Sequence, residues 1–210
     1  MLFSVLGAVA ARLLGVRGAV ERFTPEDLLL LTALVDVPLL IGTLALARWL
    51  LRARPADLGL VPLTAAAVRY GTIFGLGLLA ANVALALVQQ AMLGSPPQQI
   101  ATAITSHRGV AALALDLMAV SVLTPLAEEL AFRGVLFGGL RQRLPFVWAA
   151  VLSAAVFALV HEPQAWPIVF FLGFGLALAY ERTRTLWAPI VAHAVVNGVP
   201  LVFIALGRTA

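Results

Sequence analysis

Two adjacent glutamates, Glu128 and Glu129, lie inside an apolar run that is long enough to cross a membrane, and Arg133 follows them. A charged side chain at the centre of a bilayer costs about 2.5–3.5 kcal/mol or more, so such residues are rare in membrane spans and usually functional. Glu129 and Arg133 share one face of a helix and can pair, because they are four positions apart. Glu128 is rotated from that face by about 100°. We therefore expect Arg133 to neutralise Glu129 and Glu128 to face a cavity.

The later apolar runs contain three further polar residues of interest, His161, His193 and Asn197. His193 and Asn197 share one helical face, because they too are four positions apart. Counted from the predicted cytoplasmic ends of their spans, Glu128 and His161 both lie about 22 Å deep, and His193 and Asn197 lie about 9 and 15 Å deep. We expect these side chains to converge on one cavity that opens toward the cytoplasm, where Glu128 can meet His161.

This set of residue types suggests activation of water. A carboxylate with a histidine beside it can deprotonate water and later protonate a leaving amine. An asparagine amide can donate to an oxyanion, a contact whose loss slows reactions by about 10²–10³. Each feature alone also has a structural explanation, because histidines, Glu–Arg pairs and His/Asn pairs all serve to pack or tie helices. Adjacent glutamates combined with polar groups on three helices favour catalysis, with the candidate residues Glu128, Glu129, His161, His193 and Asn197.

A zinc site is the alternative use of the same residues. His161, His193 and Glu128 would supply the three protein ligands of a catalytic zinc ion. The chain contains no cysteine, and the HExxH spacing of zinc proteases is absent, because Ala165 stands where the second histidine would follow His161. We favour catalysis by glutamate without a metal or other cofactor, and zinc remains the alternative.

The composition identifies the elements that must hold these residues. Hydrophobic residues make up 62% of the chain and charged residues 11%, with a mean hydropathy of +1.02. An ordinary soluble domain is about 45–50% apolar and about 25% charged. The sequence therefore predicts an all-α, polytopic membrane protein, a single integral membrane domain over residues 1–210 with a catalytic core at about 115–206. With about 20 apolar residues needed for each span, six firm spans are expected at 28–50, 70–93, 110–136, 146–162, 167–181 and 187–206.

Residues 1–20 are apolar but are interrupted by Arg12 and Arg17, so they form either a seventh span or an interfacial helix. The formal net charge of +4 is carried by arginine alone, since the chain has no lysine. The arginines gather around three loops, 51–69, 138–145 and 181–186, which the positive-inside rule places in the cytoplasm. Because these arginines lie between apolar runs, they indicate membrane topology and not a nucleic-acid partner.

Three short motifs resemble those of a known family. The sequence EELAFR, from Glu128 to Arg133, resembles the EExxxR motif of the CPBP or Abi family, which comprises the type II CAAX prenyl endopeptidases and their bacterial relatives. FALVH, from Phe157 to His161, is similar to the FxxxH motif of the family, and HAVVN, from His193 to Asn197, is similar to its third motif. The motifs occur in the expected order on separate predicted helices, and the resemblance covers about residues 115–206.

The resemblance implies an intramembrane endopeptidase of the glutamic type, which cleaves a membrane-associated protein or peptide within the lipid bilayer. By the resemblance, Glu128 activates water with help from His161, and His193 and Asn197 bind the substrate carbonyl and stabilise the oxyanion. Glu129, Arg133 and Phe157 would support them. The composition, rich in Ala, Leu and Arg, favours a bacterial inner membrane with the active site on the cytoplasmic side. The alternative is a non-enzymatic scaffold or a bacteriocin self-immunity protein that retains the protease fold.

Overall fold

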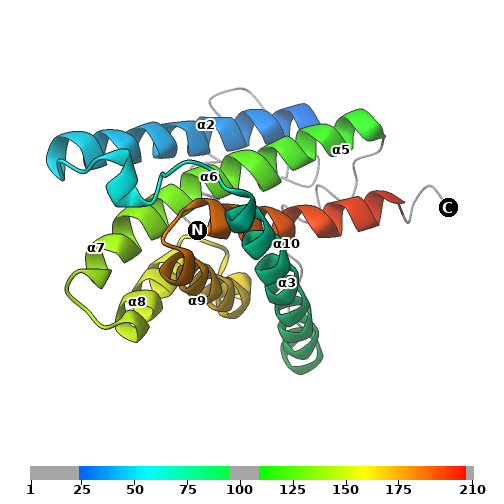
Figure 1. The fold of residues 1–210 in the computed structure, drawn as a ribbon. Helices are drawn as coiled ribbons and strands as arrows, with labels where there is room; N and C mark the ends of the chain where they lie inside the picture. Colours follow the sequence, from blue (N-terminus) through cyan, green and yellow to red (C-terminus); the bar gives the residue numbers. More distant parts are fainter. Residues whose placement is uncertain (1–23, 95–108, 207–210) are drawn as a thin grey trace.

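The computed structural model describes residues 24–94 and 109–206, and within these two ranges the chain forms helices and no strand (Figure 1). The predicted all-α membrane fold is confirmed. Within the described ranges, the helices that are long and apolar enough to cross a membrane are Pro25–Leu50, Ala65–Met92, Val110–Arg141, Pro163–Thr183 and Trp187–Leu206. Residues 1–20, for which a seventh span or an interfacial helix was expected, lie outside the described ranges.

The predicted span at 146–162 is shorter than expected. It corresponds to α8 (Phe146–Leu159), a helix of 14 residues, whereas a bilayer-spanning helix needs about 20. The chain turns after α8 because a residue that precedes a proline disfavours the helical conformation. Glu162, which precedes Pro163, is accordingly extended, with a φ of −65° and a ψ of 137°. The fold therefore has five long apolar helices in its described part, with α8 as a shorter sixth.

The helix that carries the adjacent glutamates changes its geometry on both sides of them. Val110–Arg141 runs as one apolar helix of 32 residues, and α5, α6 and α7 follow one another along it in Figure 1. Its consecutive parts are α5 (Val110–Leu117), the π-helical η4 (Met118–Leu123), α6 (Thr124–Glu129), the π-helical η5 (Leu130–Phe137) and α7 (Gly138–Arg141). Such π-helical segments are rare and frequently occur at functional sites.

α2 (Pro25–Ala45), which continues as η2 (Leu46–Leu50), lies alongside α5 and α6 (Figure 1). Its first turn is closed by a capping box, in which Thr24 Oγ1 accepts from the backbone N–H of Asp27 and the Asp27 carboxylate accepts from the backbone N–H of Thr24. This arrangement satisfies two backbone donors that a helix start otherwise leaves unpaired.

α3 (Ala65–Leu93) and α10 (Trp187–Leu206) pack at close range because small residues face each other. A Cβ atom on Gly71 would lie 2.6 Å from the Ala188 carbonyl oxygen, and one on Gly75 would lie 2.8 Å from the Ala192 Cα. Small residues at such positions allow membrane helices to approach closely. Since Ala192 precedes His193 in α10, this contact fixes the helix that carries His193.

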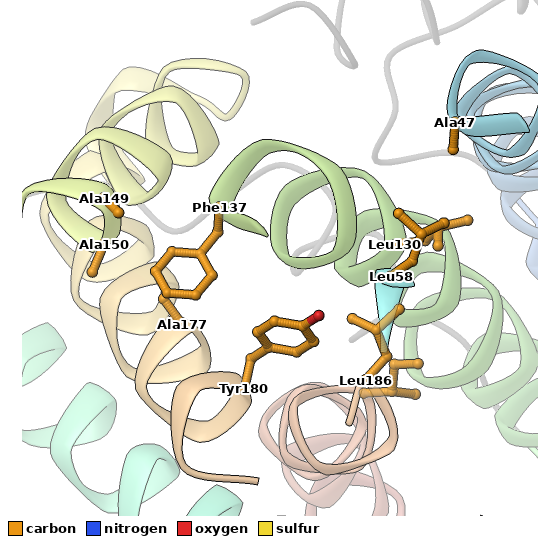
Figure 2. Packing of buried hydrophobic residues seen from close by; sticks show 10 residues of the cluster. Ala47, Leu58, Leu130, Phe137, Ala149, Ala150, Ala177, Tyr180 and Leu186 are labelled. Carbon is orange, nitrogen blue, oxygen red and sulfur yellow. The ribbon is translucent and has the colours of Figure 1, made fainter. Parts of the chain in front are cut away.

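A buried cluster joins the central helix to α8 and to α9 (Trp166–Thr183), as Figure 2 shows. The rings of Phe137 and Tyr180 meet edge to face, with their centroids 6.0 Å apart. Ala149 and Ala177 are fully buried beside them, and their small side chains leave room for the two rings. The cluster therefore holds α8 and α9 against η5, and so positions the helices that carry the rest of the site.

Three loops meet at the same end of the bundle. The backbone N–H of Leu186 donates to the Gly59 carbonyl at 2.9 Å, and the Trp187 indole donates to the Val61 carbonyl at 2.7 Å. Arg141 and Arg184 both pair with Glu181, at 3.1 and 2.9 Å. These contacts join the loops that follow η2, α7 and α9, which agrees with the expectation that the three arginine-rich loops share one side of the membrane.

Gly75→Ala should destabilise the protein, whereas the matched variant Gly77→Ala should not. A Cβ on Gly75 meets the backbone of α10, but a Cβ on Gly77 meets nothing within 4 Å. Overpacking of this kind costs about 1–3 kcal/mol. Thermal unfolding of both variants in lipid nanodiscs measures the difference, and equal midpoints for the two variants would show that the close approach of α3 and α10 does not matter for stability.

Candidate active site

Glu129 and Arg133 form a fully buried ion pair, which confirms the pairing expected from their spacing. Arg133 NH1 lies 3.1 Å from Glu129 Oε1, and both side chains have an exposed fraction of 0%. The other terminal nitrogen of Arg133 donates to the Gly173 carbonyl at 3.2 Å, which ties this face of η5 to α9. Because the pair is shielded from solvent, each charge depends on the other for its compensation.

Phe157 forms a wall of the site. The Arg133 guanidinium lies 4.4 Å from the centre of the Phe157 ring, a cation–π contact. The same ring meets Phe132 and His161 edge to face, at centroid distances of 4.9 and 4.8 Å. Phe157 therefore contacts both the ion pair and His161, and its supporting role in catalysis remains a prediction.

Glu129 also binds His193. The Nδ1 atom of His193 lies 2.8 Å from Glu129 Oε1, the same oxygen that accepts from Arg133. An ionised carboxylate can only accept, so Nδ1 of the imidazole carries the hydrogen. This leaves Nε2 of His193 on the far side of the ring, where it lies 3.9 Å from Glu128 Oε2. The spacing of the sequence motifs gave no signal for this Glu129–His193 contact.

Glu128 occupies the space between the two histidines. Its side chain is 4% exposed. Its Oε1 lies 3.9 Å from His161 Nε2, and its Oε2 has no hydrogen-bond partner within the described part of the chain. A separation of 3.9 Å is too long for a direct hydrogen bond, and polar groups at such a distance are commonly bridged by a water molecule.

His161 is oriented by the end of α8. Its Nδ1 lies 2.7 Å from the Phe157 carbonyl oxygen, so Nδ1 carries the hydrogen and Nε2 presents a lone pair toward Glu128. The Trp166 indole donates to the His161 carbonyl at 3.1 Å and holds the loop that follows α8. The side chain of His161 is 23% exposed, more than that of either glutamate.

Asn197 lies one turn beyond His193 and contacts the central helix. Its Nδ2 donates to the Val120 carbonyl at 2.8 Å, and Val120 belongs to the π-helical segment η4. The structure thus brings Glu128, Glu129, His161 and His193 into one cluster. It places Asn197 at the border of the cluster, where its amide joins α10 to η4.

Sequence reasoning missed a further acidic residue beside the site. Asp36 on α2 is 4% exposed, and its Oδ2 accepts a hydrogen bond of 2.6 Å from Thr124 Oγ1. Thr124 precedes Glu128 by one helical turn. The signal was present, because Asp36 is the single ionisable residue between Leu28 and Ala47 in an apolar span, but no motif includes it.

The zinc alternative has suitable ligand chemistry but not a ready geometry. Imidazole nitrogen and carboxylate oxygen atoms are ordinary zinc ligands, and His161, His193 and Glu128 lie near one another. Among the residues that the structure describes, however, no group of three or more such side chains is arranged to hold a metal ion. Independence from a metal remains a prediction.

The substitutions Glu128→Gln and Glu129→Gln should differ in their effect on the stability of the protein. Glu129→Gln leaves Arg133 without its buried counter-charge, so we expect the free energy of unfolding to fall by about 3–5 kcal/mol. Glu128→Gln removes a carboxylate that has no ionic partner closer than 3.9 Å among residues 24–94 and 109–206, so the free energy of unfolding should change much less. Unfolding of both variants under identical lipid conditions gives the comparison, and a less stable Glu128→Gln would reverse the assigned roles.

Residues 110–199 match the family described as type II CAAX prenyl endopeptidase Rce1-like. The putative membrane peptidase YdiL of Bacillus subtilis is 33% identical over 89 residues, which cover 42% of this chain and 36% of that protein. The membrane-embedded CAAX protease MroQ of Staphylococcus aureus is 36% identical over 91 residues, which cover 40% of this chain and 37% of that protein. The UPF0177 protein YxdF of Lactococcus lactis is 27% identical over 107 residues, or 47% of this chain and 59% of that protein.

The alignments therefore span little more than a third of the length of the first two relatives. No solved structure matches the chain. The matched segment contains every residue of the cluster around Glu128, together with Arg133, Phe157 and Asn197. The expected resemblance is confirmed, because residues 110–199 are similar to the type II CAAX prenyl endopeptidase Rce1-like family.

Proposed function

We propose that the protein is an intramembrane endopeptidase that hydrolyses a peptide bond of a membrane-associated protein or peptide, with water activated by Glu128 and His161. The observation that carries the proposal is the position of the Glu128 carboxylate. It is buried, it has an oxygen with no hydrogen-bond partner within the described residues, and it lies 3.9 Å from Nε2 of both His161 and His193. Two relatives are named as a putative membrane peptidase and a CAAX protease, which supports the same class of reaction.

In the proposed first step, Glu128 accepts a proton from a water molecule held between it and His161. The water oxygen adds to the carbonyl carbon of the substrate, and the carbonyl oxygen becomes an oxyanion. In the second step the protonated Glu128, assisted by His161, gives the proton to the leaving nitrogen and the C–N bond breaks. The products are a carboxylic acid and an amine, which become a carboxylate and an ammonium group when the amine takes up the proton of the acid, and Glu128 is again ionised.

The oxyanion would be stabilised by His193 and Asn197. Glu129 binds Nδ1 of His193 and fixes the orientation of the imidazole ring. In the proposed mechanism, the imidazole in its protonated form donates to the oxyanion from Nε2. The Asn197 amide uses one hydrogen on the Val120 carbonyl and has a second one to donate. Arg133 and Phe157 would act indirectly, by fixing Glu129 and the two imidazole rings.

The short helix α8 supports a supply of water at this depth. At 1.5 Å per residue its 14 residues extend about 21 Å, less than the hydrocarbon core of about 30 Å. The loop that contains His161 therefore begins within the membrane. Irregular backbone at such depth is tolerated where it is buried in protein or lines a water-filled cavity, and His161 is the more exposed partner of Glu128.

The proposed location is a bacterial inner membrane, with the active site open to the cytoplasm. The arginine-rich loops at one end of the bundle support this orientation by the positive-inside rule, and the relatives reported above are bacterial proteins. The expected substrate is embedded in the bilayer or attached to it, because the cluster around Glu128 is buried among apolar helices.

Glu128→Gln should abolish peptide cleavage and leave the protein folded. Loss of a general base slows a reaction by about 10²–10⁴. The assay is mass spectrometry of a membrane-embedded peptide library incubated with purified protein in nanodiscs. The matched control is Glu26→Gln, the same change at an exposed glutamate in the first turn of α2. Cleavage by Glu128→Gln at the wild-type rate would refute the mechanism. A folded wild-type protein that cleaves no peptide would favour the scaffold or immunity alternative.

Thorough chelation should leave the activity unchanged, and the purified protein should contain no stoichiometric zinc. We expect this because Glu128 and His161 can activate water without a metal in the proposed mechanism. Elemental analysis and cleavage rates before and after chelation provide the measurement. Activity that is lost to a chelator and restored by zinc alone would instead make His161, His193 and Glu128 metal ligands.

A further inference from the structure

A buried carboxylate from outside the matched segment adjoins the site. Asp36 lies in the middle of α2 and is 4% exposed, whereas the Rce1-like match begins at residue 110. An ionisable residue at this position in a membrane helix is costly and is usually functional. The mechanism described above leaves Asp36 without a role.

A hydrogen bond connects Asp36 to the helical turn that carries Glu128. Thr124 Oγ1 donates to Asp36 Oδ2 at 2.6 Å, across 88 positions of sequence. Thr124 and Glu128 are four positions apart in α6, so they lie on the same face of the helix. Because α2 packs against α6 and against both π-helical segments beside it, this bond fixes the rotation of α6 relative to α2.

Asp36 also acts on the site through its charge. It interacts electrostatically with Glu128 and with His193. The other charged or titratable groups around Glu128 are Glu129, Arg133 and His161, and Asp116 lies on α5, which also packs against α2. Removal of the Asp36 carboxylate should therefore change the electrostatic surroundings of Glu128 and His193.

We propose that Asp36 is a positioning residue of the catalytic centre, which orients Glu128 through its hydrogen bond with Thr124 and acts electrostatically on His193. The proposal rests on the proposed peptidase function for its kinetic consequences. If the proposal holds, α2 completes the active site of the Rce1-like segment, and residues 110–199 alone lack one of the residues that position Glu128.

The kinetic test compares two substitutions that preserve shape. Asp36→Asn removes the charge but keeps an oxygen that can accept from Thr124, and Thr124→Val removes the hydroxyl donor. We expect each to lower kcat by about tenfold or more with little change in KM, since the positioning acts on the chemical step. Thr124→Ser, which retains a hydroxyl, should keep most of the wild-type kcat.

The controls are Thr43→Val, which removes another buried hydroxyl of α2, and Asp57→Asn, which removes a carboxylate in the loop after η2. Both should retain the wild-type kcat. Thermal unfolding of all variants separates lost folding from lost chemistry. The proposal would be overturned if Asp36→Asn had the wild-type kcat. It would also be overturned if the activity of this variant fell only in proportion to the amount of folded protein.

A second readout does not depend on peptidase activity. The chain has three histidines, so the ring nitrogens of His193 can be observed by NMR after ¹⁵N-histidine labelling and assigned with a His193→Gln variant. We expect Asp36→Asn to change the His193 signals at a fixed pH and Asp57→Asn to leave them unchanged. Identical His193 signals in wild type and Asp36→Asn would refute the coupling. If the wild type cleaves no peptide, the proposed function fails while this measurement still tests the role of Asp36.

Discussion

The site depends on one carboxylate oxygen, Oε1 of Glu129, which accepts from two buried partners. Arg133 NH1 lies 3.1 Å from it and His193 Nδ1 lies 2.8 Å from it. Arg133 neutralises the glutamate, and His193 links α6 to α10 across 64 positions of sequence. Removal of one partner would leave a buried charge uncompensated, at a cost of several kcal/mol. The three side chains therefore hold one another in a single arrangement.

This arrangement determines what the neighbouring glutamate can do. Arg133 is paired with Glu129. The Glu128 carboxylate instead faces Nε2 of His161 and of His193, at 3.9 Å from each. Both imidazoles have their Nδ1 atoms engaged, His161 by the Phe157 carbonyl and His193 by Glu129. Two adjacent residues of identical chemistry thereby have different surroundings, and the proposed mechanism assigns them different roles.

The local part of the site could be predicted from the sequence, and the contacts between helices could not. The pairing of Glu129 with Arg133 follows from helical periodicity alone. The contact of Glu129 with His193 depends on how α10 is rotated against α6, which close packing and the neighbouring π-helical segments determine. Asp36 was missed for the same reason, because its partner Thr124 lies on another helix. Hydropathy located the long helices but overestimated the length of α8. This helix ends before the extended residue that precedes Pro163.

The most direct test of the Glu129-centred arrangement is a double-mutant cycle on the free energy of unfolding with Glu129→Gln and His193→Gln. A hydrogen bond to a charged group contributes about 1.5–3 kcal/mol, so we expect a coupling energy in this range between Glu129 and His193. The same cycle between Glu128 and His193 should give a coupling near zero, since 3.9 Å separates their nearest atoms. A coupling to Glu128 that equals or exceeds the coupling to Glu129 would contradict the division of roles between the two glutamates.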